Sequence, residues 1–134
     1  MNTTYFLNLV SGNVFGSQKT PAIPTNYYLG LSSTAPSLDG SNVTEPGEGT
    51  GYARVQLTSL SIPINGVVTN DAAIDFAEST AEWGTMTHFV IYDALTEGNL
   101  LMYGELSASR KVEAATIMTI KLGSLNLSVV NPTA

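Results

Sequence analysis

The spacing of apolar residues changes along the chain and separates a helical start from a strand-rich remainder. Four apolar side chains recur at the spacing of one helix face: Tyr5, Phe6, Leu9 and Val10. Thr3 or Thr4 is placed to cap the first turn of this helix. Two prolines then favour extended backbone over residues 16–25. The pattern predicts a short helix near the start of the chain. Residues 1–25 are expected to form an attachment or oligomerisation arm, followed by one domain over residues 26–134.

From residue 27 onward, apolar and polar residues alternate as they do in half-buried strands. Strands are predicted at residues 27–32, 52–57, 74–76, 86–92 and 99–106, and between residues 115 and 130. The run at 86–92 is the most apolar and is expected to be central, and the parity of the last segment changes at Gly123. Asn65-Gly66 and Glu97-Gly98 are expected to close hairpins. About seven short strands predict an all-β fold, an antiparallel β-sandwich.

Two stretches rich in turn residues are expected to form one exposed end of this sandwich. The longer covers residues 36–51 and contains several Pro and Gly residues. The second covers residues 71–83 and is rich in acids. Loops of this length in compact domains are usually functional or mobile.

Composition narrows the range of partners. The chain has 134 residues, 5 basic against 11 acidic residues and a net charge of −6, so a phosphate backbone would be repelled and nucleic acid is an unfavourable partner. It has no cysteine, and neither a signal peptide nor a membrane-spanning segment is predicted. Only 12% of the residues are charged, against about 25% on average. Such sparse charge favours a protein whose surface is partly covered by copies of itself or by a larger assembly.

Catalytic and metal chemistry is weakly supported. His88 is the only histidine, and Asp93 lies on the opposite strand parity, so a Ser-His-Asp triad is not favoured. Paired carboxylates of a glycoside hydrolase are an alternative among four acids: Asp71, Asp75, Glu78 and Glu82. Loop carboxylates offer a calcium site at Asp71 with Asp75, or at Asp39, Glu45 and Glu48. Surface charge is the favoured interpretation of all of them, and no catalytic residue, cofactor or metal is assigned.

Aromatic residues offer a binding alternative. Tyr52 and Trp83 lie in or beside the predicted loops, where exposed rings would stack on sugars. The competing interpretation places the tyrosines at the edge of the core with their hydroxyl groups in water. Core or interface packing is the favoured interpretation of the aromatic residues, and Tyr52 and Trp83 are the candidates for binding on exposed loops.

Four segments carry a resemblance to a known family. They are YLGLSSTAP from Tyr28, GYARVQL from Gly51, STAEWGTMTHFVIYDA from Ser79 and GNLLMYGEL from Gly98. In order and spacing the chain resembles a family of small tailed-phage virion proteins, usually labelled tail-fibre proteins. Members of that family often have a glycine-acid turn before the last strands, where this chain has residues 113–116, EAAT.

The resemblance implies a non-enzymatic structural protein on the outside of a tailed-phage virion, either tail-fibre-type or a capsid decoration module. It would act by packing against other virion proteins, as a homo-oligomer for which a trimer is favoured. The predicted interface is the apolar helix face named above. The alternative function is a carbohydrate-binding adhesin that recognises a host-surface glycan.

Overall fold

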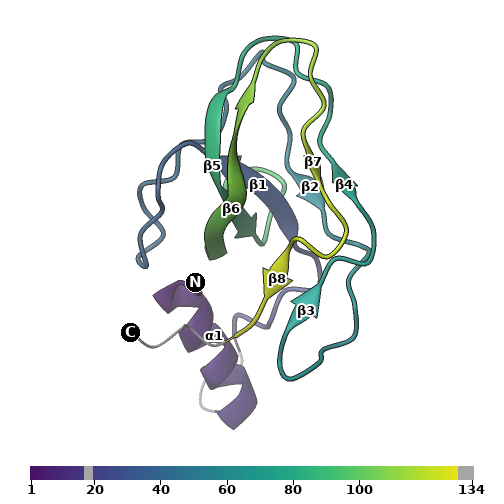
Figure 1. The fold of residues 1–134 in the computed structure, drawn as a ribbon. Coiled ribbons are helices and arrows are strands. Elements are labelled where there is room, and N and C mark those ends of the chain that lie inside the picture. Colours follow the sequence, from purple (N-terminus) through teal and green to yellow (C-terminus); the bar gives the residue numbers. More distant parts are fainter. Residues whose placement is uncertain (17–19, 130–134) are drawn as a thin grey trace.

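Two layers of antiparallel strands form the body of the molecule, and one helix lies at its lower end (Figure 1). The computed structural model describes residues 1–16 and 20–129. The larger sheet has the order β2 (Val55–Gln56), β1 (Tyr28–Ser32), β5 (Gly84–Tyr92) and β6 (Leu100–Val112). Two strand pairs make the other layer: β3 (Val68–Thr69) with β8 (Asn126–Leu127), and β4 (Ile74–Asp75) with β7 (Thr119–Ile120). The predicted all-β, sandwich-like fold is confirmed.

The most apolar run occupies the middle of the larger sheet, as predicted. β5 pairs with β1 on one side and with β6 on the other. β6 runs to Val112, six residues past the predicted end at Leu106, although its last part is polar and exposed. The predicted strand at 52–57 shrinks to two paired residues, Val55 and Gln56, which pair with β1.

Side chains from both layers fill the space between them. The largest cluster of buried apolar residues consists of Leu29, Leu31, Phe76, Trp83, Met86, Ile91, Val112, Met118, Ile120 and Leu125. Burial of each large apolar side chain stabilises the fold by about 1.5–3 kcal/mol. The cluster joins the larger sheet to the two strand pairs, so the layers form one core.

The predicted turns use backbone with positive φ. Asn65 and Gly66 have φ of 54° and 78°, and Glu97 and Gly98 have φ of 55° and 76°. Gly123, with φ of 77°, separates β7 from β8 at the predicted change of parity. The corner also turns Leu122 outward: its side chain is 66% exposed, although its parity predicted the core face.

The N-terminal helix α1 (Thr4–Phe15) extends beyond its predicted stripe and packs on the sheet. The Thr3 side chain caps it by accepting a hydrogen bond from the Phe6 amide, and Gly16 ends it in the left-handed conformation. Phe6 and Leu9 are buried against Leu101 of β6. The first part of the predicted arm is therefore attached to the domain, while residues 17–19 of its linker lie outside the described residues.

Candidate functional site

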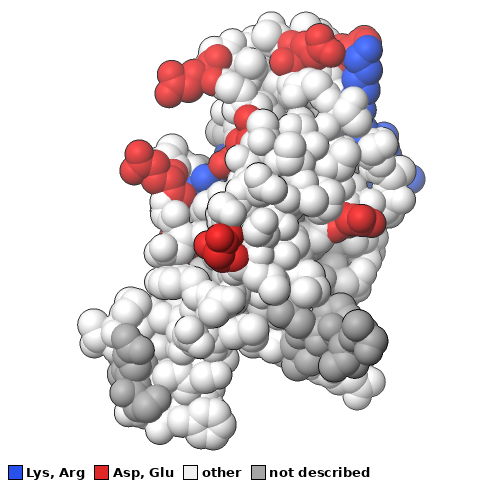
Figure 2. All heavy atoms as spheres, turned by 90° about the vertical axis from the view of Figure 1, so that its left-hand side faces the viewer, with Lys and Arg blue, Asp and Glu red and all other residues white. Residues whose placement is uncertain are grey.

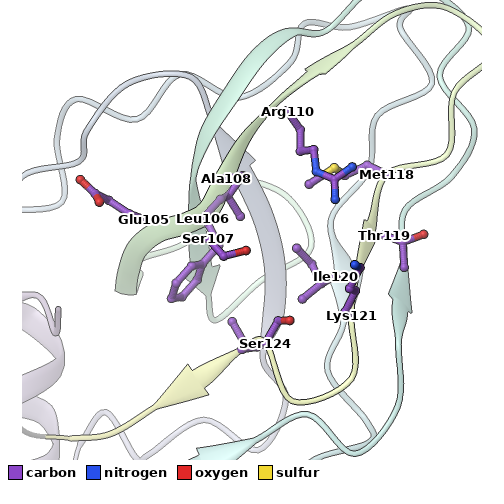
Figure 3. A pocket seen from close by; sticks show the side chains of 12 residues that line it. Glu105, Leu106, Ser107, Ala108, Arg110, Met118, Thr119, Ile120, Lys121 and Ser124 are labelled. Carbon is purple, nitrogen blue, oxygen red and sulfur yellow. The ribbon is translucent and has the colours of Figure 1, made fainter.

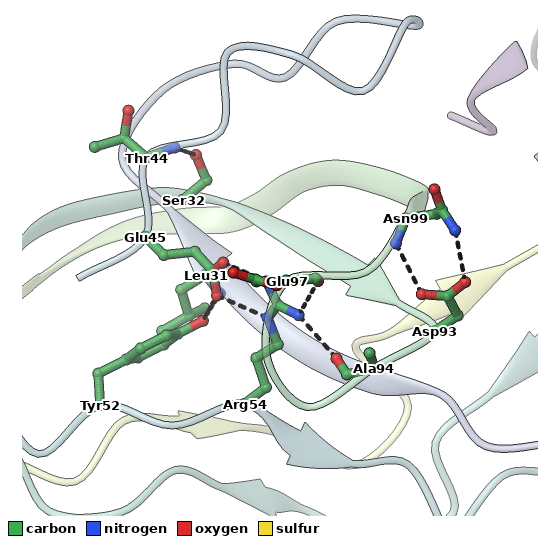
Figure 4. A network of polar contacts seen from close by, with 10 residues as sticks. All are labelled: Leu31, Ser32, Thr44, Glu45, Tyr52, Arg54, Asp93, Ala94, Glu97 and Asn99. Atoms are coloured by element: carbon green, nitrogen blue, oxygen red, sulfur yellow. Dashed lines mark hydrogen bonds and ion pairs between the residues drawn. The ribbon is translucent and has the colours of Figure 1, made fainter. Parts of the chain in front are cut away.

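The most extensive polar cluster in the described residues centres on Arg54 (Figure 4). Its guanidinium forms a two-point ion pair with Glu45, with Nη2 2.7 Å from Oε1 and Nε 3.0 Å from Oε2. Nη1 donates to the carbonyl oxygens of Ala94 and Glu97 at 2.8 and 2.7 Å. The guanidinium carbon also lies 3.6 Å from the centre of the Tyr92 ring.

Tyr52 completes this Arg54 network. Its hydroxyl donates to Glu45 Oε2 at 2.5 Å and accepts from the Leu31 amide at 3.1 Å. Burial and the hydrogen bond to Glu45 raise the pKa of Tyr52 far above its usual value. Burial alone would lower the pKa of Arg54, but the hydrogen bonds and charge of Glu45 outweigh it and raise that pKa.

The Arg54 network is a structural clamp. The Arg54 side chain is 6% exposed and that of Glu45 is 20% exposed, so the pair is largely removed from water. It ties the long loop that carries Glu45 to the turn between β5 and β6. Because the donors of Arg54 face acceptors of its own chain, the cation is committed to holding these loops together.

The two aromatic candidates lie in the core rather than on exposed loops. Trp83 is 6% exposed and its indole NH donates to the Thr50 carbonyl at 2.8 Å. Tyr52 packs edge-on against Trp83, with ring centres 5.3 Å apart, and stacks on Phe76. The expected exposure is therefore wrong for Trp83, whose ring lies in the core, while Tyr52 is half-buried and packs against that core.

The acidic candidates are exposed, except Glu45, which is held in the Arg54 network. Asp75 accepts from the Thr119 hydroxyl at 2.6 Å, and Asp39 accepts from Ser41, whose hydrogen bonds lower the pKa of Asp39. In the described ranges, no group of three or more His, Asp or Glu residues is placed to hold a metal ion. His88 shares a 2.8 Å hydrogen bond with the hydroxyl of its neighbour Thr87.

The lower end of the molecule carries no charged side chain in its described residues (Figure 2). Three charge-free segments make up this end: 1–16, 55–70 and 122–129. Helix α1 and the pair β3–β8 lie there together in Figure 1. We call this surface the charge-free pole. The acidic side chains lie above it in Figure 2, around the middle of the molecule and at the opposite end.

The charge-free pole also exposes most of the large apolar side chains that face solvent. Its exposed apolar residues are Met1, Tyr5, Val14, Phe15, Ile62, Ile64, Val67, Leu122 and Val129. Phe15 and Ile62 are 82% and 80% exposed. Among the predicted interface residues, Tyr5 is exposed and Val10 is half-buried. Phe6 and Leu9 are buried against Leu101 of the same chain.

An apolar groove of ≈ 440 Å³ crosses the charge-free pole. It lies among the helix, the larger sheet and the β3–β8 pair, and its walls include Phe6, Leu60, Met102 and Leu127. The sequence contains part of the signal for this surface, since the three stretches lack Asp, Glu, Lys and Arg, as residues 20–38 also do. Only the fold shows that those stretches meet.

The comparisons with known proteins agree with the motif resemblance. A family model described as Podophage GP4 fiber I protein gp80 matches residues 2–128, and the chain belongs to this family. No curated protein matches the chain. Fibre proteins are structural components of the virion and associate there with other virion proteins. No helix in the described residues is long and apolar enough to cross a membrane.

Proposed function

We propose that this podophage fibre-family protein is a non-enzymatic structural module on the outside of the virion, attached through its charge-free pole. The observation that carries the proposal is the coincidence of three features at one end: no charged side chain among the described residues, most of the exposed large apolar side chains, and an apolar groove. The core of a protein interface is depleted of charged residues and enriched in large apolar ones. A large exposed apolar patch is also uncommon on a free monomer.

The opposite end is suited to face solvent. Glu48, Glu78, Glu82 and Glu113 are all exposed there, and their mutual repulsion opposes tight packing. The loops that carry them are nevertheless held by hydrogen bonds. The Thr80 amide donates to the Thr50 carbonyl oxygen, and the Ser79 hydroxyl donates to the backbone carbonyl oxygen of Glu113. A module attached by one end and acidic at the other would present ordered loops at the particle surface.

The pole also supports self-association. A homo-oligomer, with a trimer favoured, would bury Val14, Phe15 and the 61–67 hairpin of each copy against its neighbours. Attachment to other virion proteins would use the same apolar end. Either contact covers side chains that the single chain leaves in water.

Two exposed substitutions test the proposal without disturbing the core. Phe15→Ser and Ile62→Ser each remove an exposed apolar side chain from the pole. Ile117→Ser is the matched control, because Ile117 is 57% exposed but lies outside the pole. The readouts are the oligomeric state by sedimentation and the number of copies incorporated into phage particles, measured by quantitative mass spectrometry.

The pole variants are expected to lose self-association or incorporation at least about tenfold, as expected when a central apolar contact is removed. Ile117→Ser is expected to behave as the unchanged protein. Equal oligomerisation and equal incorporation of all three variants would refute attachment through the pole. Thermal unfolding of each variant provides the check that the monomer fold is retained.

A further inference from the structure

The free basic side chains of this acidic protein gather on one side of the sandwich. Of the five Lys and Arg residues, Arg54 is committed to its network and Lys19 lies outside the described residues. The other three, Arg110, Lys111 and Lys121, line two adjoining hollows between β6 and β7. A chain of net charge −6 thus brings its accessible described cations together.

An irregularity in β6 shapes the larger part of this region, which we call the β6–β7 pocket. Met86 pairs with Arg110 and His88 pairs with Glu105, so residues 106–109 of β6 stand opposite one residue of β5. Such a bulge bends a strand and redirects its side chains. Beneath it lies a cavity of ≈ 240 Å³.

The β6–β7 pocket combines apolar walls with a polar rim (Figure 3). Its apolar lining is made by Phe89, Leu106, Ala108, Met118, Ile120 and Leu125. Hydroxyl groups come from Ser107, Thr119 and Ser124. Arg110 comes from β6 and Lys121 directly follows β7, and Figure 3 shows both charged ends directed toward the space between these strands.

The two cations are not neutralised within the described chain. No carboxylate oxygen there lies within 4.0 Å of the charged nitrogens of Arg110 or Lys121. Glu105 contributes to the lining, but Figure 3 shows its carboxylate turned away from the other labelled side chains. Asp75 is engaged by the Thr119 hydroxyl at 2.6 Å. Lys111 differs from both, because it pairs with Glu113 at 3.6 Å.

We propose that the β6–β7 pocket binds an acidic sugar residue that carries a carboxylate or a phosphate group. Arg110 and Lys121 would hold the anion with charge-assisted hydrogen bonds. The serine and threonine hydroxyl groups would bond the sugar hydroxyls, and the apolar walls would cover the ring. The cavity is below the range of about 300–1,000 Å³ that suits drug-sized ligands, which favours a single ring.

The bulge argues against an extended acidic peptide as the ligand. Peptides that add to a sheet need a regular row of free backbone groups along the edge strand. The bulge at residues 106–109 interrupts that row on β6, and such bulges protect natural sheet edges from pairing. The pocket shares only Ser124 and Leu125 with the segments of the charge-free pole, and both of its cations lie outside them. This inference therefore stands independently of the proposed mode of attachment.

The test is a titration of the full-length protein with single sugars, followed by ¹H–¹⁵N NMR. The probes are glucuronate, glucose 6-phosphate and neutral glucose. Either acidic sugar is expected to shift amide signals at residues 106–110 and 118–125, with at least about tenfold tighter binding than glucose. Selectivity between the two acidic sugars would identify the anionic group.

Three variants localise the binding. Arg110→Gln and Lys121→Gln are each expected to weaken binding of the acidic sugar about tenfold. Lys111→Gln removes the same charge from an exposed, paired lysine beside the pocket and is expected to change binding less than about twofold. All three positions are exposed, so unchanged spectra away from the pocket will confirm that the fold is intact.

Two results would overturn the assignment. The first is equal loss of binding in all three variants, or no preference for acidic over neutral sugar. The second is a glutamate-rich peptide that shifts the same amides as strongly as the acidic sugars, which would make the pocket a docking site for an acidic protein segment.

Discussion

Replacing Glu45 by glutamine removes one charge from the Arg54 network and preserves the shape of the side chain. Arg54 would then keep its hydrogen bonds to Ala94 and Glu97 but lose its counter-charge. Breaking a buried ion pair by removing one partner costs about 3–5 kcal/mol. Because Glu45 is 20% exposed, we expect a loss below this range, about 2–3 kcal/mol in the free energy of unfolding.

The chain contains a matched control for this substitution. Lys111 and Glu113 form an ion pair at 3.6 Å whose side chains are 62% and 71% exposed. Exposed pairs of this kind contribute about 0–1 kcal/mol. Glu113→Gln is therefore expected to change the free energy of unfolding by less than about 0.5 kcal/mol. The two substitutions remove the same charge and differ in burial and geometry.

Urea unfolding followed by fluorescence provides the measurement, because Trp83 is the only tryptophan and is buried against Tyr52. A double-mutant cycle with Arg54→Met separates the pair from its surroundings. We expect a coupling of about 2 kcal/mol between Glu45 and Arg54, and faster amide exchange at residues 94–98 in Arg54→Met. Equal, small effects of Glu45→Gln and Glu113→Gln would refute the clamp.

Three further predictions test the local account. Ala115 has φ of 61°, so Ala115→Gly is expected to raise the free energy of unfolding by about 0.5–1.5 kcal/mol in urea titrations, and a loss of stability would contradict the strain. At Gly30, an added Cβ would lie 2.5 Å from the Tyr52 hydroxyl, so Gly30→Ala is expected to lower the melting temperature more than the exposed Gly47→Ala. The folded pKa of Tyr52 exceeds its unfolded value near 10, so its contribution is complete below pH about 10 and is lost as pH rises above it. Urea titrations from pH 8 to 11 are expected to show that the free energy of unfolding falls as pH rises, and that it falls less in Tyr52→Phe. Equal slopes of the free energy of unfolding against pH in the two proteins would contradict the burial of the Tyr52 hydroxyl.

Much of the sheet was predictable from the sequence because its signals are local. Alternation marked β1, and the apolar run marked β5 as central. The Asn65-Gly66 turn and the corner at Gly123 followed from the backbone freedom of their residues. The sequence does not predict the full length of β6, because most of its last part is polar and exposed and has no apolar pattern.

The polar network and the binding surfaces depend on contacts between distant segments. Alternation placed Arg54 on the polar side of a strand, whereas the fold buries it against Glu45 and the turn after β5. Trp83 was assigned to an exposed loop because its neighbours are acidic, yet its ring completes the core. The β6–β7 pocket was not foreseen, because Arg110 and Lys121 come together only through the bulge and the corner after β7.

Cryo-electron microscopy of the intact phage particle tests attachment through the charge-free pole. If the pole is the attachment surface, the pole, with Phe15 and Ile62, is expected to lie within contact distance of another protein chain. The acidic end with Glu48 and Glu82 is then expected to face solvent. A particle in which the pole is open to solvent and the acidic end is buried against a neighbour would contradict attachment through the pole.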